Sequence, residues 1–149
     1  MKRLVLEYWT PLVVWLVAIF LFSTDTFSSA ETSRIIVPFL KFLFPGLSPD
    51  DLQTWHGVLR KIAHVAAYFI LAVFAYRSLK YGQSDLVQPK VRAMVFVASA
   101  ALLDEFHQGF TVSRGASIVD VGYDCLGAVW ALWLITAYET RRLRPYSVL

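Results

Sequence analysis

The sequence predicts an all-α integral membrane protein, with four transmembrane helices in one domain over residues 1–149. Hydrophobic residues make up 57% of the chain and charged residues 17%, whereas soluble domains average about 45–50% and about 25%. The apolar residues form four runs, each close to the ~20 residues that cross a bilayer core. The Lys and Arg residues lie near the ends of these runs rather than in one basic tract, which argues against nucleic acid as a partner.

The four predicted spans follow from the apolar runs. They cover about residues 4–22, 58–79, 91–110 and 118–138. The flanks of the first run also fit a signal peptide, with the small residues Ser28, Ser29 and Ala30 as a cleavage site. The length of the run favours an uncleaved span over that alternative.

Both termini are predicted to be cytoplasmic because of where the basic residues fall. With this orientation, nine of the 14 Lys and Arg residues are inside and five are outside, as the positive-inside rule requires. The outside set is Arg34, Lys41, Arg60, Lys61 and Arg114. We therefore expect a multi-pass protein of the cell membrane, surrounded by membrane lipids.

Residues 23–57, between the first two spans, are predicted to lie on the outer membrane surface or to re-enter the membrane part way. Their apolar stretch "IIVPFLKFLFPGL" is interrupted by Pro38 and Pro45 and is too short to span. Ser48 as N-cap, followed by Pro49, then predicts the start of an amphipathic helix that leads into span two. The apolar stripe of this helix is Leu52, Trp55 and Leu59.

Polar side chains gather at the predicted outer ends of spans two, three and four. Charged groups within a span cost about 2.5–3.5 kcal/mol each, so they normally face the bundle interior and pair with one another. The three spans and the connection between the last two bring their polar groups to one depth on one side. The predicted set is Lys61, His64, Tyr68, Asp104, Glu105, Gln108, Arg114, Asp120 and Asp124.

Simpler structural interpretations of some neighbouring residues stay open. Lys61, and to a greater degree Arg60, fit side chains that extend to lipid phosphates at the membrane boundary, and Arg60 is left out of the predicted site. Asp120 follows Ser117 by three residues and fits a helix-capping box. His107 lies on another helix face and is assigned to the surface.

The order of these motifs resembles the VanZ-like membrane protein family. The resemblance is carried by "RKIAHVAAYFILA", then "LLDEFHQGFTVSRGASIVDVGYDCLGA", and by "FSTDTFSS" after span one. These stretches are similar to the family's K-x-x-H-x-x-x-Y, D-E-x-x-Q and D-x-x-x-N-x-x-G patterns, and match on eight of the nine residues above and on Gly127. The chain departs from the family pattern at Asp124, where Asn is more usual, and at Val112 and Ser113, which replace a Pro-Gly pair.

The resemblance implies a role in the bacterial cell envelope. The family is named after a member linked to low-level resistance to the glycopeptide teicoplanin, whose target lies outside the membrane. The resemblance does not carry over a molecular activity.

The first of three functional hypotheses is an outward-facing site that binds, or also processes, the headgroup of an anionic envelope lipid or lipid-linked glycan. In this hypothesis Lys61 and Arg114 hold a phosphate or carboxylate. Glu105 and His64 are the candidate catalytic acid/base residues, and the other residues of the set contact the ligand. No nucleophile motif is present, so whether the protein is an enzyme stays open.

The second hypothesis is a non-enzymatic scaffold or envelope-stress component, in which buried charges such as a bridge from Asp124 to Lys61 or Arg114 only set helix register. The third is a proton- or ion-coupled carrier, which is disfavoured because the cytoplasmic halves of the spans hold almost no polar groups. No cofactor is predicted. A metal site at His64 and the carboxylates is disfavoured because the positive charges of Lys61 and Arg114 would oppose the binding of a cation. The sequence does not indicate an oligomeric state.

Overall fold

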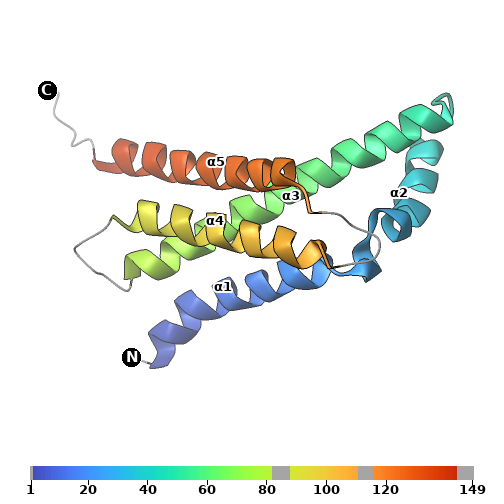
Figure 1. The fold of residues 1–149 in the computed structure, drawn as a ribbon. Helices are drawn as coiled ribbons and strands as arrows, with labels where there is room; N and C mark the ends of the chain where they lie inside the picture. The colour runs from blue at the N-terminus through green and yellow to red at the C-terminus, as the bar shows by residue number, and fades with distance from the viewer. Residues whose placement is uncertain (1, 82–87, 111–115, 144–149) are drawn as a thin grey trace, which may run out of the picture.

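The computed structural model describes residues 2–81, 88–110 and 116–143, and almost all of them are helical. No strand occurs in these ranges, so the prediction of an all-α protein is confirmed. The elements in chain order are α1 (Lys2–Phe22), the short 3-10 helix η1 (Asp25–Phe27), α2 (Ser29–Leu43), α3 (Pro49–Tyr81), α4 (Pro89–Gln108) and α5 (Ile118–Leu143) (Figure 1).

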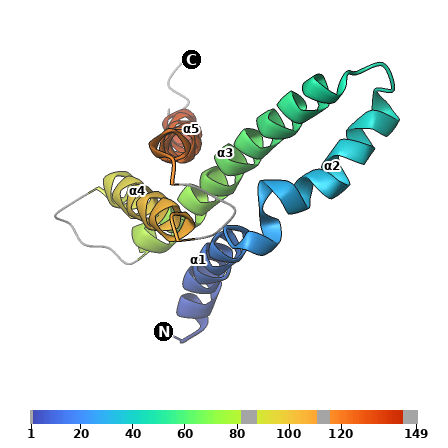
Figure 2. The ribbon, with the colours of Figure 1, turned by 45° about the vertical axis from the view of Figure 1, so that its right-hand side comes forward.

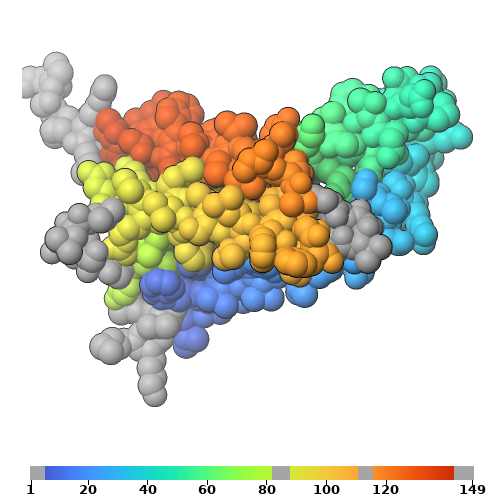
Figure 3. Space-filling view, viewed as in Figure 1, coloured from blue at the N-terminus to red at the C-terminus, as the bar shows by residue number. Residues whose placement is uncertain are grey.

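The helix α3 lies at the centre of the molecule and contacts α1, α2, α4 and α5, of which α5 packs on it most extensively. In the space-filling view α4 covers the front face between α5 and α1 (Figure 3). Small side chains line the interfaces among α3, α4 and α5 and allow the helices to approach closely. Such packing is typical of membrane helices, because no hydrophobic driving force pushes helices together in lipid. The buried alanines are Ala72, Ala75, Ala93, Ala100, Ala101, Ala128 and Ala131.

In the part of the chain that the structure describes, two helices are long and apolar enough to cross a membrane: α3 and residues Ile118–Arg142 of α5. A third crossing results if Leu6–Phe22 and Asp25–Leu43, which bend by 75° at the break between them, form one broken or re-entrant segment. The helix α4 does not qualify, because its 20 residues include two basic and two acidic ones. Large apolar side chains are exposed along α1 and α5, for example Val14 and Trp133, as lipid surroundings require.

The helix α2 and the first half of α3 form an antiparallel pair that extends away from α4 and α5 (Figure 2). The predicted helix start at Ser48 is confirmed as the start of α3. Ser48 Oγ accepts a hydrogen bond from Asp51 N at 3.1 Å, and Asp51 Oδ2 accepts one from Ser48 N at 3.3 Å. The amphipathic helix and span two are one continuous helix of 33 residues. Pro38 lies inside α2 and does not end it.

The helix α1 is tied to α3 by two hydrogen bonds from side chains to backbone. Trp15 Nε1 donates to Ala67 O at 2.8 Å, and Ser78 Oγ donates to Tyr8 O at 2.6 Å. The start of α1 and the end of α5 lie at one end of the bundle, while the end of α4 and the start of α5 lie at the other (Figure 1). The polar segments singled out in the sequence therefore meet beside the middle of α3.

Candidate functional site

A histidine–carboxylate pair joins α3 to α5. His64 Nδ1 lies 3.0 Å from Asp124 Oδ1, and the Asp124 side chain is fully buried. When Asp124 is ionised, Nδ1–H donates to it and the second ring nitrogen, Nε2, is the one left to accept or donate a proton. Among the described residues the partner of Asp124 is therefore His64, and not Lys61 as one sequence-based alternative had it.

A second polar network joins α4 to the end of α1. Gln108 Nε2 donates to Asp104 Oδ2 at 3.0 Å, one helical turn earlier, and lies 3.4 Å from Ser23 Oγ as a longer hydrogen bond. All three side chains are buried. The i, i+4 spacing of Asp104 and Gln108 places them on one face of α4, and the structure turns that face inward.

Glu105 contacts the start of α5. Its Oε2 accepts a hydrogen bond from Ser117 N at 2.6 Å. Ser117 Oγ in turn accepts from Asp120 N at 3.3 Å, so Ser117 is the N-cap of α5. The capping box predicted for Asp120 is not complete, because Ser117 N donates to Glu105 and not to Asp120. Glu105 thus links α4 to α5.

Four buried polar atoms have no hydrogen-bond partner among the residues that the structure describes. They are Tyr68 Oη, Asp104 Oδ1, Glu105 Oε1 and Asp124 Oδ2. Buried polar groups are nearly always paired, because an unpaired one costs about 1–3 kcal/mol. Three of these atoms are carboxylate oxygens, which accept hydrogen bonds when ionised, and one is a phenol that donates. The unpaired atoms of the cluster are therefore mainly acceptors that lack a hydrogen-bond donor.

A partly open cavity of about 250 Å³ lies between α1, η1, α2, α3 and α4. One part of its lining is polar and another is apolar, so the cavity is amphiphilic. The polar residues are Ser23, Thr32, Arg60, His64, Tyr68 and Asp104. The larger apolar residues are Ile19, Phe22, Phe27, Ile36 and Leu59. No group of three or more His, Cys, Asp and Glu side chains in the described part of the chain is arranged to hold a metal ion.

The comparison with known families decides the identity. The model of the VanZ/LLP1 family matches residues 8–139, which include every residue of the cavity and of the networks around it. The chain belongs to the VanZ/LLP1 family. At the level of this family, membership links it to teicoplanin resistance. No curated protein and no solved structure matches the chain.

Seven of the residues at VanZ-family motif positions lie in two groups in space. His64, Tyr68 and Asp104 line the cavity, while Asp124 and Gln108 contact members of this group from behind. The second group, Glu105 and Asp120, lies at the start of α5. Of the two candidate acid/base residues, only His64 lines the cavity.

Lys61 lies outside the cavity. Its side chain is exposed, and its ammonium lies 5.1 Å from the centre of the Tyr123 ring on α5. At 100° per residue, Lys61 is about 60° from His64 around the axis of α3. The side of α3 that carries Lys61 faces Tyr123 of α5. Arg114 lies outside the described residues. The binding roles of both residues stay predictions.

Sequence reasoning missed Arg60 as a cavity residue. Arg60 is half-buried, lines the cavity and interacts electrostatically with Asp120. The signal was its position four residues before His64, which places the two on one helix face. The sequence also gave no sign that Thr32 Oγ1 and His56 Nε2 lie 3.2 Å apart, a contact that ties α2 to α3 at the cavity.

Proposed function

We propose that this VanZ-family chain crosses the bacterial cytoplasmic membrane four times, with both termini inside and the cavity toward the outer side. The distribution of basic residues supports this orientation. So does the position of the start of α1 and the end of α5 at one end of the bundle, since an even number of crossings returns the chain to its starting side.

The proposed ligand is the headgroup of an anionic lipid-linked glycan. The amphiphilic cavity carries this proposal. Arg60 supplies a cation for a phosphate, while Tyr68 Oη and the unpaired Asp104 Oδ1 suit sugar hydroxyls, which both donate and accept hydrogen bonds. Ile19, Phe22 and Ile36 form a wall against which a lipid chain would pack. At about 250 Å³ the cavity suits one sugar or phosphate rather than a whole glycan.

The proposal is one of binding, with His64 as the residue able to exchange a proton with the ligand. Asp124 orients the imidazole and leaves Nε2 available. The cavity hydroxyl of Thr32 donates to Ser28 O at 2.8 Å and contacts His56, so it is not paired with His64 as a nucleophile would be.

Replacing Tyr68 with phenylalanine tests the hydrogen-bonding part of the proposal. The change removes only a hydroxyl that makes no close hydrogen bond among the described residues and that lies near the Asp104 carboxylate, so the melting temperature of the purified protein should change little. The affinity for a short-chain polyprenyl diphosphate carrying one sugar should fall about threefold to tenfold, the usual range for one lost hydrogen bond. Native mass spectrometry in mild detergent measures both bound lipid and its displacement.

The matched control is Tyr123→Phe, which removes the same hydroxyl from a half-buried tyrosine of α5 outside the cavity. It should leave the affinity unchanged. Equal affinity in wild type and Tyr68→Phe, or tighter binding of the lipid without its sugar, would contradict a glycan site. Unchanged binding together with a lowered melting temperature would favour the scaffold hypothesis.

Replacing Arg60 or Lys61 with glutamine decides which cation binds the phosphate. The two residues are adjacent and carry the same charge, but only Arg60 lines the cavity. Arg60→Gln should weaken binding of the diphosphate probe about tenfold to a hundredfold, as for a lost charge-assisted hydrogen bond. Lys61→Gln should change it less than about twofold. The reverse order would restore the sequence-based role of Lys61 and exclude this cavity as the phosphate site.

A further inference from the structure

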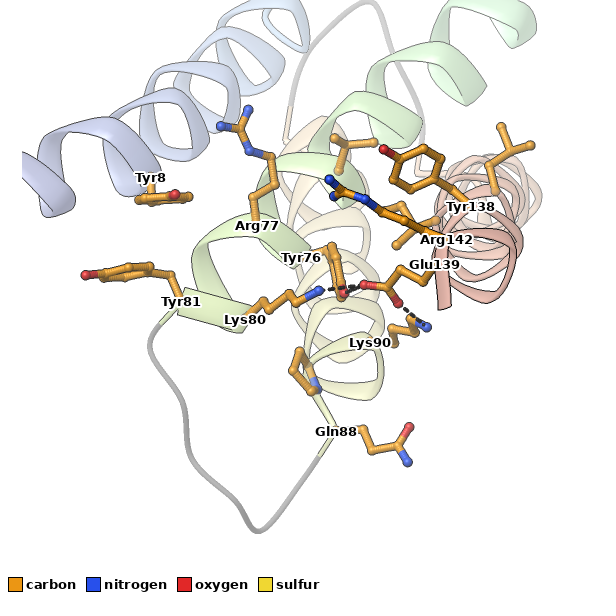
Figure 4. Close-up of a pocket in the computed structure, with 14 residues that line it drawn as sticks. Tyr8, Tyr76, Arg77, Lys80, Tyr81, Gln88, Lys90, Tyr138, Glu139 and Arg142 are labelled. Atoms are coloured by element: carbon orange, nitrogen blue, oxygen red, sulfur yellow. Dashed lines mark hydrogen bonds and ion pairs between the residues drawn. The ribbon is translucent and has the colours of Figure 1, made fainter. Parts of the chain in front are cut away.

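A second and larger groove lies at the opposite end of the bundle, where α1 starts and α5 ends (Figure 4). Its volume is about 1260 Å³, and residues of α1, α3, α4 and α5 line it. Four of them are basic and one is acidic. These five are Arg77 and Lys80 of α3, Lys90 of α4, and Glu139 and Arg142 of α5.

Glu139 pairs with both lysines and offsets one of their two positive charges. Its Oε1 lies 2.6 Å from Lys80 Nζ and also accepts a hydrogen bond from Tyr76 Oη, and its Oε2 lies 2.9 Å from Lys90 Nζ. One carboxylate thus joins α3, α4 and α5 at this end (Figure 4). Because both of its oxygens are occupied, it leaves the arginines to other partners.

The two arginines have no acidic partner among the described residues. Arg77 lies over the ring of Tyr8, 5.7 Å from its centre. Arg142 extends from α5 across the groove toward α3 (Figure 4). Both guanidinium groups line the same space, and a planar guanidinium binds a phosphate through two parallel hydrogen bonds.

The deeper part of the groove is apolar. Val73 lies one turn of α3 before Arg77, and Leu134 lies two turns of α5 before Arg142, and both line the groove. Tyr138 is at an intermediate level, the depth at which tyrosine rings occur at membrane–water interfaces. Cations beside an apolar wall match a phosphate that is attached to an acyl chain.

We propose that this groove binds an anionic phospholipid, with the phosphate between Arg77 and Arg142 and an acyl chain along Val73 and Leu134. A basic pocket between membrane helices recognises such headgroups through charge and hydrogen bonds. This site lies at the other end of the bundle from the cavity proposed to bind a glycan. Its unpaired groups are arginines, whereas those at the cavity are mainly carboxylate oxygens, so either proposal can fail without the other.

The test compares Arg142→Gln with Arg141→Gln in the full-length protein. Both changes remove one exposed positive charge from the same helix end, but only Arg142 lines the groove. Nanodiscs of phosphatidylcholine with added phosphatidylglycerol are used, and native mass spectrometry counts the phosphatidylglycerol retained. Arg142→Gln should weaken retention about fivefold, as expected for one basic residue, and Arg141→Gln less than about twofold.

Three outcomes would overturn the proposal. Equal losses in the two variants would mean that phosphatidylglycerol responds only to net charge. Equal retention of phosphatidylcholine and phosphatidylglycerol by the wild type would exclude an anion-selective site. Displacement of the lipid by millimolar inorganic phosphate would show that the groove takes a free anion and not a phospholipid. Arg142 makes no ion pair among the described residues, so Arg142→Gln should keep its melting temperature.

Discussion

Replacing Gly127 with alanine is expected to prevent α3 and α5 from packing as closely as they do and to lower the stability of the protein far more than the same change at Gly122. A Cβ at position 127 would lie 3.0 Å from Phe69 N and closer still to Val65 O. Both atoms belong to the backbone of α3, so no side-chain rotation relieves the clash, and the helices must separate. Overpacking of this kind costs about 1–3 kcal/mol and occasionally more.

The measurement is the thermal unfolding of the purified protein in detergent, followed by circular dichroism or by loss of the monodisperse peak. The matched control is Gly122→Ala, five residues earlier in the same helix, where a Cβ meets nothing within 4 Å. Because alanine favours the helix over glycine by about 1 kcal/mol, the control should be neutral or more stable. A Gly127→Ala protein as stable as Gly122→Ala would mean that α3 and α5 do not cross as described.

Replacing His64 with alanine is expected to destabilise the fold as well as to remove the proton-exchanging group of the cavity. Asp124 is fully buried, and its one hydrogen bond among the described residues is to His64. The variant leaves this buried carboxyl group without its hydrogen-bond partner, and an unpaired buried group costs about 1–3 kcal/mol, more when it is charged. We expect a correspondingly large fall in the melting temperature.

A double-mutant cycle with Asp124→Asn separates stability from binding. Asparagine removes the charge and retains a carbonyl that accepts from Nδ1–H, so the single variant should lose far less stability than His64→Ala. The double variant should be more stable than His64→Ala alone, a non-additive result that marks contacting residues, but glycan binding should stay low in both. As a control, the exposed His107 makes a ring contact with Phe20, and His107→Ala should change stability by about 0.5 kcal/mol or less. Additive losses would disprove the coupling.

Much of the site was predictable because membrane burial makes polar groups costly. Tyr68, Asp104, Gln108 and Asp124 stand in apolar helices, and all four are buried in the structure. The helix starts at Ser48 and before Asp120 were predictable for a local reason, since a cap depends on residues three apart in the chain.

The choice between neighbouring residues was not predictable. Arg60 and Lys61 lie about 40° and about 60° from His64, on opposite sides, and both fit one helix face in the sequence. Which of them enters the cavity depends on where the neighbouring helices lie. The helix α5 takes the side of Lys61, where Tyr123 meets its ammonium, and leaves Arg60 to the cavity beside α1 and α2.

By itself the sequence determined that the chain is helical and apolar, which family it resembles, and that a few polar side chains must be buried, because composition, local spacing and the cost of desolvation act on short stretches of chain. Only the tertiary structure decided the partners. The close approach at Gly127 sets how α5 crosses α3, and that crossing pairs Asp124 with His64. Contacts between residues 60 positions apart depend on this crossing angle, and no local pattern encodes it.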